Sequence, residues 1–213
     1  MSNHPFELTT VIYADPTTVE EVRRLRDALP PSGVPVMDAH VTVYGRVFDL
    51  DPQVALERLR HICRLHAPMM LRAQGLEAWF GGPGPTRTIN SSRVSLRHEP
   101  IDGGDVPGVS LGLPVTCPSA LRDLHLAVYS VLADDAMGGA FGAPATYRPH
   151  LTLTQDMARD RLAEAIVTIG DVPSWTFEAH EVALMRREAE GFVLVGTAPL
   201  LAAREAPIQL LRP

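Results

Sequence analysis

The sequence predicts one domain of mixed helices and strands, built as two lobes around a shared site. The same order of elements occurs twice, over about residues 6–97 and 108–198: strand, helix, short strand with a His-x-Thr motif, helix, and two strands. Residues 98–107 form the one polar, glycine-rich stretch near the middle of the sequence, so no long linker separates the halves. We therefore expect an internal duplication with the active-site cleft between the lobes, and residues 199–213 as a C-terminal extension.

Strand and helix signals alternate along the first half. β-branched and apolar residues predict a strand over residues 6–14, and a capping box at Thr17 or Thr18 predicts a helix that Pro30 ends. The further elements expected here are a strand over residues 39–48, a helix from Asp51-Pro52, and strands over 69–80 and 86–97.

The second half repeats this order. We expect a strand over residues 108–116, and an apolar stripe at helical spacing predicts a helix over about 119–133. A loop rich in glycine, alanine and proline at 138–145 leads to the second motif strand. The remaining elements are a helix over about 157–169 and strands near 175–186 and 192–198.

Composition and charge limit the classes of function. The 213 residues carry a net charge of −6, which argues against a long nucleic acid as partner but permits a nucleotide or an RNA end. All 19 basic residues are arginine, so the chain has no lysine for a ligase adenylate, a P-loop or a Schiff base.

Localisation and cofactors are also constrained by the sequence. No apolar run approaches the roughly 18 residues that span a membrane, and Met1 to Pro5 lacks the features of a signal peptide. The two cysteines are too few for a disulfide framework or a thiolate metal site, and no His-x-x-x-His pair with an acidic partner occurs. We expect a cytoplasmic monomer without a metal or other cofactor and without a membrane partner.

Two short segments carry the candidate chemistry, and they are His40-Val41-Thr42-Val43 and His150-Leu151-Thr152-Leu153. Side chains alternate across a strand, so the histidine and threonine of each segment share one face while the apolar residues pack on the other. Two such strands would supply two imidazoles and two hydroxyls to one site. Matching positions in the two half-repeats make a chance occurrence of both motifs improbable.

This set of groups suits hydrolysis of a phosphodiester without a metal. One imidazole takes a proton from the attacking water, the other protonates the leaving oxygen, and the hydroxyls hold the non-bridging oxygens. Histidine fits both roles because its ordinary pKa of about 6.5 allows neutral and protonated forms near neutral pH. A bell-shaped pH profile is expected, and the sequence leaves open which histidine is the base.

With these motifs and the approach Tyr147-Arg148-Pro149 to the second one, the chain resembles the 2H phosphoesterase superfamily, over most of residues 6–198. That superfamily includes bacterial RNA 2′,5′-ligase-like proteins and 2′,3′-cyclic nucleotide phosphodiesterases. The resemblance implies an α+β fold of two lobes with antiparallel sheets and flanking helices, and no need for metal or ATP. It also implies hydrolysis of a 2′,3′-cyclic phosphate to a 2′-phosphate. The catalytic set that it implies is His40, Thr42, His150 and Thr152.

Further residues are candidates for substrate binding. Tyr44 and Arg46 continue the face of the first motif if its strand stays regular, and Thr154 does so for the second. Arginine can neutralise phosphate charge and an aromatic ring can stack on a base. The candidates for substrate binding are Tyr44, Arg46, Trp79, Tyr147, Arg148 and Arg186.

Three alternatives stay open. The same site could act on 2′,5′-linked oligonucleotides, ADP-ribose cyclic phosphate or a signalling nucleotide. The protein could also be a binding module for nucleotides or RNA ends that has lost turnover. A third alternative treats the motifs as coincidental strands of a structural domain, and it predicts that His40 and His150 lie far apart.

Overall fold

A computed structural model describes seven stretches of the chain, and the account below is confined to them. They are residues 7–33, 36–48, 50–80, 108–116, 118–133, 147–171 and 174–201. The strand expected over residues 86–97, the loop at 138–145 and most of the C-terminal extension lie outside the described residues.

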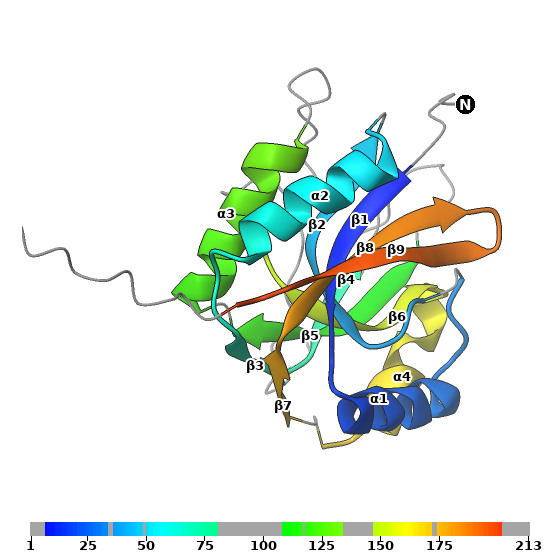
Figure 1. Cartoon of the computed structure of the whole chain (residues 1–213). Coiled ribbons are helices and arrows are strands. Elements are labelled where there is room, and N and C mark those ends of the chain that lie inside the picture. The colour runs from blue at the N-terminus through cyan, green and yellow to red at the C-terminus, as the bar shows by residue number, and fades with distance from the viewer. Residues whose placement is uncertain are drawn as a thin grey trace, which may run out of the picture.

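The strands form one curled antiparallel sheet (Figure 1). They are β1 (Glu7–Tyr13), β2 (His40–Phe48), β3 (Met69–Gln74), β4 (Glu77–Phe80), β5 (Val109–Thr116), β6 (His150–Met157), β7 (Ser174–Ala179), β8 (Glu181–Glu188) and β9 (Gly191–Pro199). Their order is β7-β3-β5-β6-β2-β1-β8-β9, and β4 also pairs with β5. The two motif strands, β2 and β6, are therefore neighbours near the middle of the sheet.

Four α-helices cover the sheet in the described part of the chain: α1 (Pro16–Ala28), α2 (Pro52–Cys63), α3 (Ser119–Leu132) and α4 (Leu162–Ile169). In Figure 1, α2 and α3 lie together at one end of the sheet, and α1 and α4 lie at the other. This confirms the expected mixture of helices and antiparallel strands. None of the helices described is long and apolar enough to cross a membrane.

Aspartate-proline pairs start the first two helices. The Asp15 carboxylate accepts hydrogen bonds from the backbone N–H groups of Thr17 and Thr18, and Asp51 caps α2 in the same way. Proline at the first helical position loses no hydrogen bond, because that N–H has no partner within the helix. The predicted capping box at Thr17 or Thr18 is therefore wrong by two or three residues, since the Asp15 carboxylate already occupies the cap.

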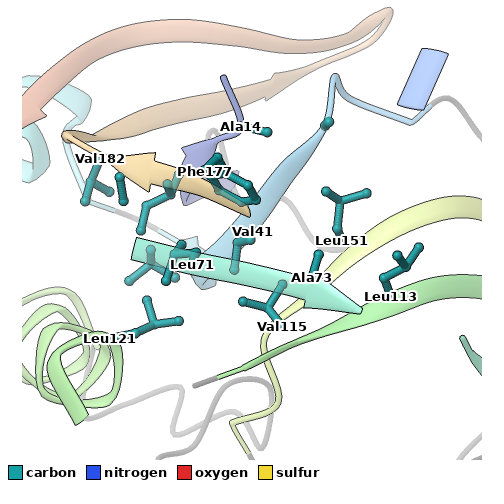
Figure 2. Packing of buried hydrophobic residues seen from close by; sticks show 14 of the residues in the cluster. Ala14, Val41, Leu71, Ala73, Leu113, Val115, Leu121, Leu151, Phe177 and Val182 are labelled. Carbon is teal, nitrogen blue, oxygen red and sulfur yellow. The ribbon is translucent and has the colours of Figure 1, made fainter. Parts of the chain in front are cut away.

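The buried core lies on the side of the motif strands that carries their apolar residues. Val41 and Leu151 are fully buried and face each other in the ladder between β2 and β6. Figure 2 shows them beside Leu71 and Ala73 of β3 and Phe177 of β7. The alternation of each motif is thus satisfied, because its apolar residues enter the core and its polar residues point the other way.

Two segments predicted as single strands are divided in the structure. The strand predicted over residues 69–80 breaks at Gly75, which has a φ of +81°, and the strand predicted near residues 175–186 breaks at His180. After Gly75 the chain loses one neighbour, because β3 pairs with β7 and β5 whereas β4 pairs with β5. After His180 it changes partners, because β7 pairs with β3 whereas β8 pairs with β1 and β9. The predicted helix over 157–169 is also shorter, because Met157 ends β6 and a 3-10 turn precedes α4.

A β-bulge follows the threonine of each motif. Val11 pairs with Thr42 but Thr10 pairs with Tyr44, so one extra residue of β2 lies between these pairs. The same shift occurs in β6, where Gly112 pairs with Thr152 and Leu111 pairs with Thr154. A bulge ends the regular alternation of side chains, so the faces predicted for Tyr44 and Thr154 no longer follow from those of the motifs.

Candidate active site

The two motifs lie side by side through the pairing of β2 with β6. Their ladder contains the antiparallel pair Val41 and Leu151, whose side chains enter the core. The flanking residues of both strands therefore face the opposite side together, with His40 toward Thr152 and His150 toward Thr42. The interpretation of the motifs as unrelated strands predicted distant histidines and is contradicted by this arrangement.

Backbone carbonyls orient both imidazoles in the same manner. The Nδ1–H of His40 donates to the carbonyl of Asp38 at 2.7 Å, and the Nδ1–H of His150 donates to that of Arg148 at 3.0 Å. A carbonyl oxygen can only accept, so the proton of each neutral ring is on Nδ1. Each Nε2 is then left with a lone pair for proton transfer, as acid-base chemistry requires.

Burial keeps both histidines less basic than usual. Desolvation lowers the pKa of His40 to about 4, with smaller contributions from the hydrogen bond to Asp38, which raises it, and from Arg26 and His150, which lower it. Desolvation also lowers the pKa of His150, opposed by the hydrogen bond to Arg148 and by the charge of Glu77. Both rings are therefore neutral at pH 7 in the free protein, and His40 has the stronger burial penalty.

An indole ring lies beside His150. The ring centroids of Trp79 and His150 are 4.4 Å apart, at an interplanar angle of 43°. Gly112 makes room for this ring, because a Cβ there would lie 2.7 Å from Trp79 Cη2 and 2.6 Å from the Leu151 carbonyl oxygen. The sequence selected Trp79 as a substrate-binding candidate, and the structure places it next to one motif histidine.

A tyrosine that the sequence did not single out lies beside His40. Tyr13 is the cross-strand partner of His40, and their ring centroids are 6.3 Å apart. The Tyr13 hydroxyl donates to the sulfur of Met185 at 3.5 Å. Its position at the end of the first predicted strand gave no signal, because only the register between β1 and β2 brings it to the histidine.

Arg26 of α1 joins the segments that carry the two motifs. Its Nη1 donates to the carbonyl of Met37 at 2.8 Å, and its Nη2 donates to the carbonyl of Thr152 at 2.6 Å. Met37 lies three residues before His40, so one guanidinium ties the approach to the first motif to the strand of the second. Nothing in the sequence distinguishes Arg26 from the other 18 arginines.

Tyr147 connects the approach to the second motif with the strand of the first motif. Its hydroxyl donates to the carbonyl of Thr42 at 3.1 Å, and its ring stacks on that of His125 with centroids 3.8 Å apart. His125 is fully buried and its Nδ1 donates to the carbonyl of Val43 at 2.6 Å. Tyr147 therefore holds the two motif strands together, whereas the neighbouring Arg148 side chain is exposed.

Two predicted substrate-binding residues, Tyr44 and Arg186, do not join the four motif residues, and neither does Thr154, which was expected on the face of the second motif. Tyr44 is 7% exposed and packs against Tyr129 and His125 of α3, because the bulge turns it into the core. Thr154 is buried for the same reason. Arg186 pairs with Leu8 of β1 and its side chain contacts Glu188. Leu8 lies about 16 Å along β1 from Tyr13, the residue that pairs with His40. The side chain of Arg46 lies outside the described residues.

No metal cluster is present among the residues that the structure describes, since no three histidine, cysteine, aspartate or glutamate side chains gather there. Cys63 is buried within the core, and burial raises the pKa of its thiol to about 12. Cys117 lies outside the described residues.

Comparison with known proteins agrees with this geometry. Residues 13–191 match the model of the family described as the 2'-5' RNA ligase superfamily, and this match covers more than half of the chain. The chain therefore belongs to the 2'-5' RNA ligase superfamily, and the predicted 2H phosphoesterase relationship is confirmed. No curated protein is significantly similar to it in sequence.

Solved structures share the fold at low sequence identity. TT0787 of Thermus thermophilus is 16% identical with a TM-score of 0.57, over 92% of this chain and 99% of that one. Apo LigT of E. coli is 14% identical with a TM-score of 0.57, over 94% and 100% of the two chains. A further structure of LigT, complexed with 3'-AMP, is 15% identical with a TM-score of 0.56 over the same shares.

Proposed function

We propose that this protein is a metal-independent phosphodiesterase that opens a 2′,3′-cyclic phosphate of a nucleotide or RNA end to a 2′-phosphate. The observation that carries the proposal is the pair of histidines on adjoining strands, each with Nδ1–H fixed by a carbonyl. Water attacks phosphorus as one Nε2 removes its proton, and the bond to the 3′ oxygen breaks as the other imidazolium supplies a proton to that oxygen. The reaction balances with water alone as co-substrate.

The acid-base roles follow from the environments of the two rings. His40 is the base, because burial and the positive charge of Arg26 keep it unprotonated. His150 is the acid in this proposal: desolvation lowers its pKa in the free protein, but the hydrogen bond to Arg148 and the charge of Glu77 oppose that effect, and a bound phosphate favours the protonated ring. After one turnover the proton taken by His40 must return to solvent and His150 must be reprotonated.

The remaining contacts suit a nucleotide. The hydroxyls of Thr42 and Thr152 lie on the same face as the histidines and can donate to the non-bridging oxygens. Trp79, beside His150, offers a surface on which a base can stack, and the exposed Arg148 can meet phosphate charge. Structures of E. coli LigT complexed with 3'-AMP and with ATP support a nucleotide as the class of ligand.

We also infer that the two halves, about 6–97 and 108–198, arose by duplication and form two lobes with the site between them. Both halves begin with the order β-α-β-α-β-β. Six strands pair in the order β4-β5-β6-β2-β1-β8. If β5 is matched to β1, β6 to β2 and β4 to β8, the strands β6, β5 and β4 follow the same order outward from the centre as the strands β2, β1 and β8. The bulges after Thr42 and Thr152 occupy matched positions, which supports a pseudo-twofold axis through the pair of motif strands.

The test is turnover of 2′,3′-cyclic nucleotides by histidine variants in the presence of a chelator. His40→Ala and His150→Ala should each lower kcat by about 10² to 10⁴-fold, and the double variant should lose less than the product of the two. His180→Ala is the matched control, because His180 is exposed and lies between β7 and β8. Wild-type rates in both single variants on every cyclic phosphate would overturn the proposal.

Product identification separates the alternatives that use the same site. The substrate panel includes a 2′,3′-cyclic nucleotide, a 2′,5′-linked oligonucleotide and ADP-ribose cyclic phosphate, each analysed for 2′- against 3′-phosphate products. Preferential turnover of one of the latter two would keep the mechanism and replace the substrate. Tight binding without any product would instead identify a non-catalytic nucleotide-binding module.

A further inference from the structure

A pocket of about 370 Å³ lies between α1, the segment that follows it and β6. Its lining includes Arg26, Pro30, Ser32, Val36, Leu153 and Thr154. Leu153 is 1% exposed and belongs to the buried core, and none of the four motif residues lines the pocket. The volume is at the lower end of the range of small-molecule sites.

Two polar atoms of the lining residues are buried without a hydrogen-bond partner, and these are Nε of Arg26 and Oγ1 of Thr154. Thr154 is 1% exposed, so its hydroxyl has almost no contact with bulk solvent. Buried polar groups are nearly always paired in folded proteins, because an unpaired one loses its hydration without compensation. Two such atoms at one pocket indicate a ligand that supplies their partners.

The charge of Arg26 has no carboxylate partner in the described part of the chain. Its two terminal nitrogens donate to neutral backbone carbonyls, and nearby Asp38 is already paired with Arg23 at 2.8 Å. A half-buried guanidinium in this position favours an anion. The hydroxyl of Thr154 can donate to the same anionic group, while Pro30, Val36 and Leu153 provide an apolar wall.

The other half of the fold shows what fills the matching space. Tyr44 follows the bulge of the first motif as Thr154 follows that of the second, and its ring packs against Tyr129 and His125 of α3. The small Thr154 side chain leaves the corresponding space against α1 unfilled. The pocket therefore lies beside the position that carries an aromatic ring in the first half, and Thr154→Phe tests whether an aromatic side chain fills it.

We propose that this pocket is a binding site for a small organic anion, distinct from the catalytic face, whose anionic group contacts Arg26 and Thr154. The apolar part of the ligand lies on Pro30, Val36 and Leu153. The site is linked to the catalytic strands because Arg26 also binds the carbonyls of Met37 and Thr152. An anion that neutralises Arg26 raises the pKa of His40, which otherwise faces Arg26, His150, Asp38 and Tyr13.

The experiment is an NMR titration of the full chain with butyrate, with inorganic phosphate as a second anion and n-butanol as the uncharged control. Butyrate should shift the Arg26 Nε–Hε resonance saturably, and n-butanol at equal concentration should not. Thr154→Val should weaken binding about fivefold through loss of one hydrogen bond, and Thr154→Phe should abolish it by filling the pocket. Thr168→Val, at an exposed position on α4, is the matched control and should bind like the wild type.

A variant with both His40 and His150 replaced by alanine separates this site from the catalytic one. The butyrate shift should persist in that variant, whether or not the protein hydrolyses cyclic phosphates. Loss of the shift there, equal binding by Thr154→Phe, or no saturable shift with either anion would each overturn the inference. The wild-type His40 resonance should also titrate at higher pH when butyrate is saturating.

Discussion

A single hydrogen bond of 2.6 Å joins the guanidinium of Arg26 to the backbone carbonyl of Thr152 and so connects a helix of the first half to the second motif. The same side chain holds the Met37 carbonyl just before the first motif. Arg26 thus acts on geometry and charge together, because it spans the two motif segments and disfavours protonation of His40.

Replacing Arg26 by glutamine should move the acidic limb of the pH-activity profile. The charge of Arg26 lowers the pKa of His40, so its removal raises that pKa and shifts the limb set by the base to higher pH. Loss of two hydrogen bonds from a charged donor should also cost about 2 kcal/mol of stability. Profiles of kcat/KM against pH for Arg26→Gln and for Arg24→Gln, an exposed arginine of the same helix, check this prediction. An unshifted limb in Arg26→Gln would contradict it.

Stability should fall as the pH drops from about 6.5 to 4. The pKa of His40 is about 4 in the folded protein and about 6.5 in the unfolded chain, so the unfolded chain binds more protons across this window. The stability is fully present above pH 6.5 and declines by about 3 kcal/mol on reaching pH 4. Urea unfolding at pH 6.5 and pH 4 measures this loss of stability. The loss should be smaller in His40→Asn than in the wild type, and in His180→Asn it should equal that of the wild type.

Trp79 should matter more for substrate binding than for the chemical step. Base stacking on an aromatic ring contributes about 1–3 kcal/mol, so Trp79→Ala should raise KM for a cyclic nucleotide about 5- to 150-fold. Trp79→Phe should retain much of the affinity. Trp175→Phe is the control, since Trp175 in β7 donates to Glu21 and lies outside the site. A fall in kcat with unchanged KM for Trp79→Ala would assign the ring to another role.

Tyr44 should be a stability residue despite its place two positions after Thr42. Its burial against α3 predicts a loss of about 3–5 kcal/mol in the free energy of unfolding for Tyr44→Ala. Tyr44→Phe keeps the ring and should retain kcat and KM within about twofold, because a group remote from the substrate adds little to the barrier. Steady-state kinetics together with denaturant unfolding of both variants test the assignment. A large kinetic defect in a stable Tyr44→Phe protein would return this residue to the active site.

Local sequence patterns were sufficient to predict those elements whose conformation depends only on residues of the same segment. The helix of residues 52–63 and the face that His40 shares with Thr42 follow from capping residues and from alternation along a single strand. The prediction of strand boundaries failed where the end of a strand depends on which other strand it pairs with. The chain loses β7 as a neighbour after Gly75 and exchanges β3 for β1 and β9 after His180, and none of these partners is visible in the local sequence.

The sequence by itself selected the candidate site, since a repeated His-x-Thr segment offers two imidazoles and two hydroxyls and the absence of lysine excludes lysine-based mechanisms. Tertiary structure alone decided which other residues stand with them. The bulges moved Tyr44 and Thr154 away from the motif face, the register brought Tyr13 to His40, and the packing of α1 carried Arg26 to Thr152. The physical reason is that strand register and helix docking depend on contacts between residues far apart in the chain, which no local pattern encodes.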